Sequence, residues 1–133
     1  MADKARSIIV EREFPHPPER IWRALTQSPL LEEWLMKNDF EPVPGRGFTF
    51  SAEWGKVEGR VLTAEPYTTL SYSWGDHDLD TVVTWTLTPM QSGTRLRMEQ
   101  TGFREGQPRY YHGAKAGWPR LLAALEGVLE RMD

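Results

Sequence analysis

The sequence predicts an α+β fold in which a long C-terminal helix lies against a curved antiparallel sheet. Residues 117–132 carry apolar side chains at three- and four-residue steps, the spacing of an amphipathic helix. Residues 48–98 instead alternate between apolar and polar side chains in short stretches rich in aromatic residues, as half-buried strands do. Because the apolar face of so long a helix must be covered, we expect helix and sheet to pack face to face.

The first third of the chain predicts one strand and two short helices. Residues 8–14 alternate as a strand and end at a proline-rich turn. The last proline of that turn, Pro18, suits the first turn of a helix that extends to about residue 26. The Ser-Pro pair that follows opens a second short helix over 28–34. We expect Trp22 and Trp34 to anchor this corner, and Trp22 to be purely structural.

Five further strands follow, and the breaks between them carry Gly, Pro, Asp and Ser, the residues of tight turns. Connections this short imply antiparallel neighbours. The expected strands are 47–54, 57–65, 69–74, 81–89 and 94–101. Together with the first strand they form a six-stranded sheet, and the predicted order is β-α-α-β-β-β-β-β-α.

The final helix is expected to begin at Pro108, which places Gly113, Gly117 and Pro119 inside it. A proline within a helix removes one backbone hydrogen bond and collides with the preceding turn, so we expect a kink between Gly113 and Pro119. The alternative is a separate short helix that ends before Gly117.

Composition limits the classes of protein to consider. A chain of 133 residues is expected to form one domain. The absence of cysteine excludes disulfides, thiolate zinc sites, a cysteine nucleophile and iron–sulfur clusters. A net charge of −3 argues against nucleic-acid binding. Neither a signal-peptide core nor a stretch long enough to span a membrane is present, so we expect a cytoplasmic protein without membrane insertion.

Motifs for catalysis or metal binding are weak. The three histidines, His16, His77 and His112, are far apart and lack the spacing of metal ligands. A nucleophile elbow and a phosphate-binding glycine loop are both absent. Three aspartates alternate at 76, 78 and 80, but they lack the glycine and distant glutamate of a calcium loop, so we expect a solvated hairpin tip. We predict no metal and no cofactor.

The inward faces of the predicted strands and helix define a candidate ligand pocket. Its expected lining is Trp34, Phe48, Phe50, Val61, Trp74, Val83, Trp85, Met98, Gln100, His112, Trp118 and Leu122. The alternative is that these side chains fill the space as an ordinary close-packed core. Gln100, His112, Tyr110 and Tyr111 are the polar groups that would hydrogen-bond a carbonyl or hydroxyl of an otherwise apolar ligand.

Several stretches carry a resemblance to a known family. They are residues 14–25, residues 28–34, Gly59-Arg60-Val61 with Pro66, Leu70 and Trp74, residues 93–96 with 101–103, and residues 112–114 with Gly117-Trp118 and the leucines at 121, 122 and 125. In this order they resemble the START-like helix-grip superfamily and, within it, the family named after the activator of the heat-shock protein 90 ATPase. The resemblance implies a curved six-stranded sheet that grips the C-terminal helix, often around a ligand cavity.

The resemblance also has departures. Many relatives carry histidine where this chain has Gln100, which removes one titrating group from the pocket mouth. The heat-shock activator works with an additional domain that is absent here, so its chaperone role does not transfer by name. The superfamily includes lipid carriers, polyketide cyclases and self-sacrificing resistance proteins, and fold alone does not choose among these functions.

Three functions are therefore kept open. The first is a non-enzymatic carrier or sensor of a small apolar molecule of aromatic, isoprenoid or lipid-like character, with loops 75–80 and 103–107 as gates. The second is a polyketide-cyclase-like enzyme in which His112 and Tyr110 or Tyr111 act as acid and base. The third is a protein-interaction module, with a chaperone as one conceivable partner, in which Arg95 and Arg97 on the outer sheet face meet an acidic surface.

Overall fold

The computed structural model describes residues 6–53, 55–76, 79–104 and 106–132. Three residues with sequence-based predictions lie outside the described residues. They are Trp54, expected in a strand, His77, one of the three histidines, and Asp78, expected at a hairpin tip. The loops expected at 75–80 and 103–107 are described only in part.

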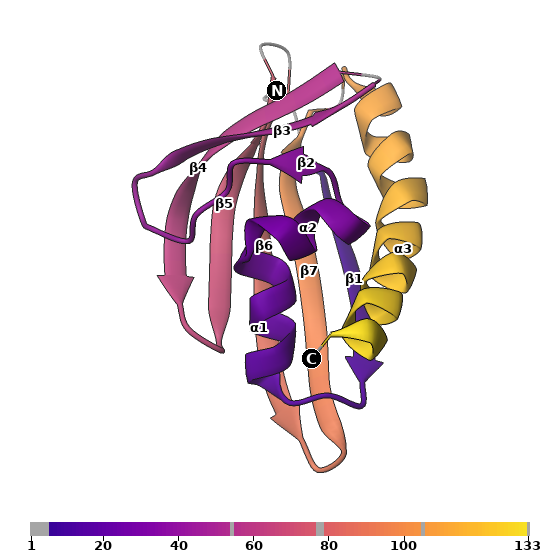
Figure 1. The fold of residues 1–133 in the computed structure, drawn as a ribbon. Helices are drawn as coiled ribbons and strands as arrows, with labels where there is room; N and C mark the ends of the chain where they lie inside the picture. Colours follow the sequence, from indigo (N-terminus) through magenta and orange to yellow (C-terminus); the bar gives the residue numbers. More distant parts are fainter. Residues whose placement is uncertain (1–5, 54, 77–78, 105, 133) are drawn as a thin grey trace.

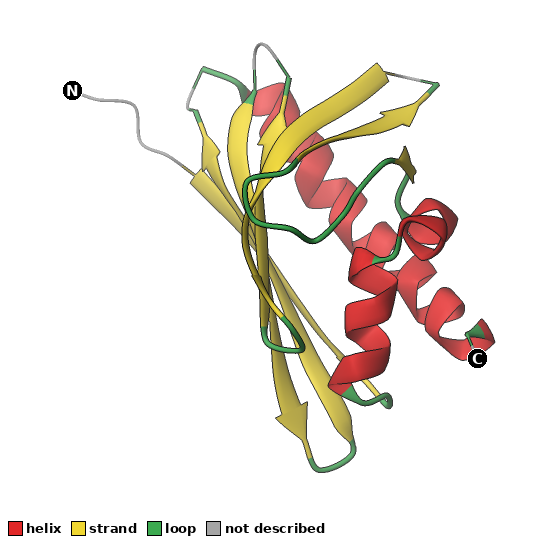
Figure 2. Ribbon diagram, turned by 60° about the vertical axis from the view of Figure 1, so that its left-hand side comes forward, coloured by secondary structure: helices red, strands yellow, loops and turns green. Residues whose placement is uncertain are grey.

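All strands belong to one antiparallel sheet, and the helices cover a single face of it. The sheet has the order β1-β7-β6-β5-β4-β3-β2. Figure 2 shows the three helices on the same side of this strongly twisted sheet, and Figure 1 shows α3 running beside β1 while α1 and α2 lie in front of the central strands. The elements are β1 (Arg6–Phe14), α1 (Pro18–Thr26), α2 (Ser28–Trp34), β2 (Lys37–Asn38), β3 (Gly47–Ala52), β4 (Gly55–Glu65), β5 (Thr69–Gly75), β6 (Asp80–Met90), β7 (Gly93–Phe103) and α3 (Pro108–Arg131).

The predicted architecture is confirmed with one correction. The sheet has seven strands rather than six, because Lys37–Asn38 forms a two-residue strand opposite Phe50 and Ser51. Two polar residues show no alternation, so sequence periodicity could not indicate this strand. The final helix is continuous from Pro108 to Arg131 with Pro119 inside it, so the alternative of a separate short helix was wrong. Within the described residues, none of the helices has the length and apolar character needed to cross a bilayer.

Strand alternation places the core as the sequence predicted. In the central strands Tyr72 lies opposite Val83, and Val83 lies opposite Gln100, so one row of side chains crosses the concave face. All three are buried. The helix α3 meets this face with the side chains that its periodicity indicated, namely Trp118, Leu122, Leu125, Val128 and Leu129.

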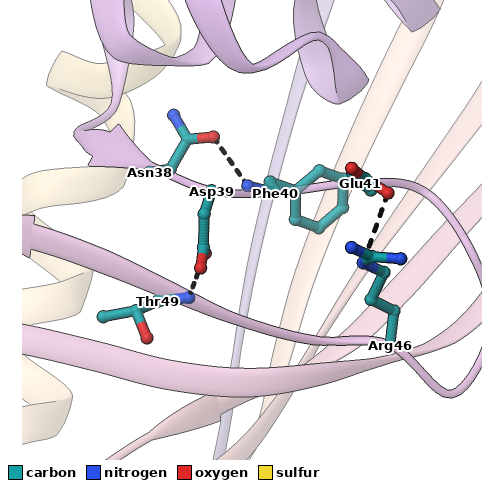
Figure 3. Close-up of polar contacts among 6 residues, drawn as sticks. All are labelled: Asn38, Asp39, Phe40, Glu41, Arg46 and Thr49. Carbon is teal, nitrogen blue, oxygen red and sulfur yellow. Dashed lines mark hydrogen bonds and ion pairs between the residues drawn. The ribbon is translucent and has the colours of Figure 1, made fainter.

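Polar contacts hold the connector between β2 and β3, and Figure 3 shows those of Asn38, Asp39 and Glu41. Its Phe40 is 2% exposed, and the ring packs against those of Phe48 and Tyr72 with centroids 5.1 and 5.5 Å away. The backbone N–H of Phe40 donates to Asn38 Oδ1, and the carboxylate of Asp39 accepts the N–H of Thr49 at 2.7 Å. The connector therefore adds a buried aromatic ring to the core and accepts a backbone N–H at the edge of β3.

Arg20 links the first helix to the end of the last one. From α1, its Nε donates to the carbonyl of Leu129 at 3.0 Å, and its Nη2 donates to the carbonyls of Leu129 and Met132. Carbonyls at a helix C-terminus lack partners within the helix and carry partial negative charge, so a guanidinium is well suited to cap them.

Replacing this cap is expected to weaken the fold. We expect Arg20→Met to lower the free energy of unfolding by about 1–3 kcal/mol, because two or more charge-assisted hydrogen bonds are lost. The stability of Arg20→Lys should lie between those of the wild type and Arg20→Met, because an ammonium group lacks the planar guanidinium that donates to two carbonyls at once. Urea denaturation measures both. Arg120→Met, an exposed position on α3, is the control and should change stability by less than about 0.5 kcal/mol; an equal loss at both positions would refute the capping role.

Candidate functional site

A cluster of aromatic rings occupies the interior between sheet and helices. Neighbouring ring centroids in the cluster lie 5.0–6.4 Å apart in tilted, stacked and edge-on pairs. These are the distances of rings in direct contact. The members are Trp34, Phe40, Phe48, Phe50, Tyr72, Trp74, Trp85 and Trp118. Much of the space that the sequence analysis proposed as a pocket is thus filled by its own side chains.

The cluster accounts for most of the predicted lining residues. Eight of the predicted twelve are at most 4% exposed and lie in the packed core, and they do not line the cavity described next. They are Trp34, Phe48, Phe50, Val61, Val83, Trp85, Met98 and Leu122. Trp22, expected to be structural, is 8% exposed and packs edge-on against Tyr67.

A half-open cavity of about 360 Å³ lies beyond the cluster, under the first half of α3. Three predicted residues, Trp74, Gln100 and Trp118, form part of its wall. Tyr110 also lines it, whereas His112 is exposed and Tyr111 packs edge-on against Phe103. The structure therefore brings two tryptophans, one amide and one phenol together, and it leaves the predicted imidazole outside.

Small residues on α3 keep this cavity open. Gly113, Ala114 and Gly117 line it from the helix side. A Cβ atom built on Gly113 or on Gly117 would meet nothing within 4 Å. The helix is thus close enough to the sheet to cover the cavity, yet it has no side chains at these positions to fill it.

The floor of the cavity contains a chain of hydrogen bonds. Trp118 Nε1 donates to Gln100 Oε1 at 2.7 Å, and Gln100 Nε2 donates to Thr81 Oγ1 at 2.9 Å. Thr81 Oγ1 in turn donates to the carbonyl of Trp74 at 2.6 Å. Gln100 and Thr81 are each 1% exposed, so this chain fixes the positions of both cavity tryptophans inside the protein.

Among the described residues of the cavity wall, the charged ones lie at the mouth. Lys56, Asp76 and Arg109 line it and are exposed, whereas the inner wall includes the buried Val57, Leu79 and Phe103. A second, more polar hollow of about 600 Å³ adjoins the mouth and shares five lining residues with the cavity. An apolar ligand with a polar end would therefore find an apolar interior and a hydrated, charged entrance.

The two expected gate loops border this entrance. The exposed Asp76 lies at its rim. Two bonds join it to the buried Leu79: the backbone N–H of Asp76 donates to the carbonyl of Leu79 at 3.0 Å, and the N–H of Leu79 donates to Asp76 Oδ1 at 2.9 Å. Phe103 stands at the start of the other loop. Opening of either loop remains a prediction.

Several cavity residues were missed by the sequence analysis. Val57 has the inward parity of β4, and Leu121 belongs to the apolar stripe of α3. The periodicity of each element was therefore a usable signal. Lys56, Met36 and Arg109 carried no such signal, because their place in the wall depends on how distant elements meet.

Titratable and metal-binding groups bear on what the site can do chemically. Burial raises the pKa of Tyr72 well above its usual value, and the Tyr72 hydroxyl accepts the Trp85 Nε1–H at 2.9 Å. It lies in the aromatic cluster and not in the cavity wall. In the described part of the chain, no group of three His, Cys, Asp or Glu side chains is placed to hold a metal ion.

The outer face of the sheet pairs its own charges. Arg95 lies 3.6 Å from the carboxylate of Glu13, and Arg97 lies 4.0 Å from Glu11 and 3.4 Å from Glu99. The two arginines proposed to meet an acidic partner thus already face acidic neighbours on β1 and β7.

Comparison with known protein families identifies the family of this chain. The sequence profile of the family described as Activator of Hsp90 ATPase homolog 1-like protein matches residues 15–130. The chain belongs to this family. No curated protein sequence matches the chain.

Solved structures show how widely the fold of this family is shared. Protein MLL2253 from Mesorhizobium loti is 54% identical, with a TM-score of 0.94 over 96% of this chain and 99% of that one. CalU16 from Micromonospora echinospora is 24% identical, with a TM-score of 0.82 over 96% of this chain and 78% of that one. The Aha1 dimer from Colwellia psychrerythraea is 21% identical, with a TM-score of 0.85 over 95% and 97%. The helix-grip fold is thus common to all of them.

Proposed function

We propose that this protein is a carrier or sensor that binds a small, mostly apolar molecule in the cavity between the sheet and the first half of α3. The observation that carries the proposal is the open volume under Gly113 and Gly117. Glycine inside a helix costs about 1 kcal/mol relative to alanine. Two such residues over one cavity are hard to explain by stability, and they are well explained by a ligand that needs the space.

The walls indicate the class of ligand. Trp74 and Trp118 lie 5.4 Å apart between ring centroids and are tilted by 52°, so they offer apolar faces to a flat ring or a branched chain. A volume near 360 Å³ falls at the lower end of the range for small-molecule sites, which favours a ligand of one or two rings over a long lipid.

The rival functions have less support. A cyclase of the expected kind needs His112 and a tyrosine to act together, and only Tyr110 of these lines the cavity. A chaperone-facing module would use Arg95 and Arg97, which already have acidic neighbours in the sheet. We also propose a cytoplasmic location, since a chain without cysteine is suited to a reducing compartment.

Filling the cavity tests the proposal. Native mass spectrometry of the freshly purified protein, with organic extraction, would identify a ligand that co-purifies, and a panel of one- and two-ring aromatics would be screened by thermal shift. A compound present at 100 times its Kd should stabilise the wild type by about 2.7 kcal/mol. We expect Gly113→Leu/Gly117→Leu to fold at least as stably as the wild type and to lose this stabilisation.

The control removes a helical glycine elsewhere. Gly127 lies on α3 outside the cavity, and a Cβ there meets only the end of the flexible Arg131 side chain. Gly127→Ala should therefore change helix propensity without changing ligand affinity. Undiminished binding in the filled variant would show that the cavity is not the site.

A further inference from the structure

We infer that the ligand carries a hydrogen-bond acceptor at its buried end, such as a ketone, ester or ether oxygen, which accepts the second N–H of Gln100. This inference rests on the proposed function and adds the chemical class of the ligand. The argument begins from the hydrogen-bond chain at the cavity floor, because that chain fixes which way the amide of Gln100 points.

The orientation of the amide follows from its two partners. An indole N–H only donates, so the Gln100 atom that Trp118 Nε1 reaches at 2.7 Å must be the carbonyl oxygen. On the other side, Thr81 Oγ1 gives its single proton to the carbonyl of Trp74 at 2.6 Å, so it accepts from the amide nitrogen of Gln100 at 2.9 Å. Both contacts agree, and a flipped amide would break both.

This orientation leaves one donor without a protein partner. An amide nitrogen has two protons, and Thr81 accepts one of them. Among the described residues no acceptor for the other is found, although Gln100 is 1% exposed and lines the cavity. A buried donor without a partner costs free energy, and an oxygen atom of a ligand would recover it. A pure hydrocarbon of the same shape would not.

The amide also selects a neutral acceptor at that depth. The side chains that line the inner wall around Gln100 include Val57, Leu79 and Phe103, and the charged residues Lys56 and Arg109 lie at the exposed mouth. Burying a carboxylate beside one neutral N–H would leave its charge largely uncompensated. The acceptor at the buried end is therefore uncharged, and any charge on the ligand lies at the entrance.

A pair of probes with the same shape tests the inference. 2-Acetylnaphthalene and 2-isopropenylnaphthalene differ in one group, C=O against C=CH₂, and their affinities would be measured by calorimetry for the wild type and for Gln100→Leu. The desolvation of the ketone is common to both proteins, so it cancels when the two ratios are compared. We expect the ratio of alkene Kd to ketone Kd to be about 3–10-fold higher in the wild type.

The outcomes separate this inference from the proposed function. Equal ratios in the two proteins, with both probes bound, would overturn the role of Gln100 and leave the cavity as the site. Failure of both probes to bind the wild type would count against the proposed function and, with it, this inference. If Gln100→Leu fails to fold, the side-chain amide signals of the wild type decide by NMR: the ketone, and not the alkene, should shift one Gln100 Nε2 proton downfield, and identical shifts would refute the contact.

Discussion

Replacing Trp85 by alanine is expected to lower the free energy of unfolding by about 3–5 kcal/mol, a large share of the total for a domain of this size. The side chain is fully buried, and its ring meets Trp34 and Trp118 edge-on at 5.9 and 5.7 Å. Its Nε1–H donates to the hydroxyl of Tyr72. The variant thus loses apolar burial, two ring contacts and a hydrogen bond at once. We expect the melting temperature, followed by far-UV circular dichroism, to fall by roughly 10–20 °C.

Leu62→Ala provides the control for this experiment. Leu62 is a large apolar side chain that is 50% exposed, and its truncation should cost less than about 0.5 kcal/mol. A loss below about 1 kcal/mol in Trp85→Ala would mean that the aromatic cluster is not close-packed. In that case the cavity would extend to Trp85, as the sequence analysis expected.

The sequence predicted which side chains face inward, but it could not predict which of them fill the interior. Trp74 and Tyr72 lie on the same strand with the same parity and both belong to the aromatic cluster, yet Trp74 also borders the cavity and Tyr72 does not. The difference comes partly from Phe40, which occupies the space beside Tyr72. Phe40 lies in an irregular connector, where periodicity carries no information about direction.

The open part of the interior depends on similar long-range placements. The sequence predicted only that Gly113 and Gly117 lie within the final helix, and it is the approach of α3 to the sheet that makes them part of a cavity wall. The fold could be predicted well because strand alternation and the stripe of α3 are local signals. The site could be predicted only in part because a cavity is the space that several distant elements leave between them.

The two halves of α3 differ in how many side chains they bury in the core. From Trp118 onward the helix buries five side chains in the core, and Glu126 pairs with Arg12 of β1 at 2.9 Å. Before Trp118 no described residue of the helix is fully buried. The anchored second half keeps the first half over the cavity, and the first half would have few buried side chains to displace if the proposed ligand entered.

Alkaline pH should unfold the protein through Tyr72. Burial raises the pKa of this phenol well above its usual value of about 10, so it stays neutral in the folded protein while the unfolded chain ionises. The stability that this group contributes is fully present below about pH 10 and is lost as the pH rises from there toward the folded pKa. We expect a slope of about 1.4 kcal/mol per pH unit from this group alone.

Tyr72→Phe separates this effect from general alkaline destabilisation. At neutral pH the variant should be less stable by about 1–3 kcal/mol, because the Trp85 N–H loses its acceptor. Above pH 10 its stability should decline less steeply than that of the wild type, so the two curves of unfolding free energy against pH converge. Tyr67→Phe, which removes a half-exposed hydroxyl, should keep the wild-type slope. Parallel curves for Tyr72→Phe and the wild type would show that the Tyr72 phenol ionises as readily in the folded protein as in the unfolded chain, and that the cluster around it admits water.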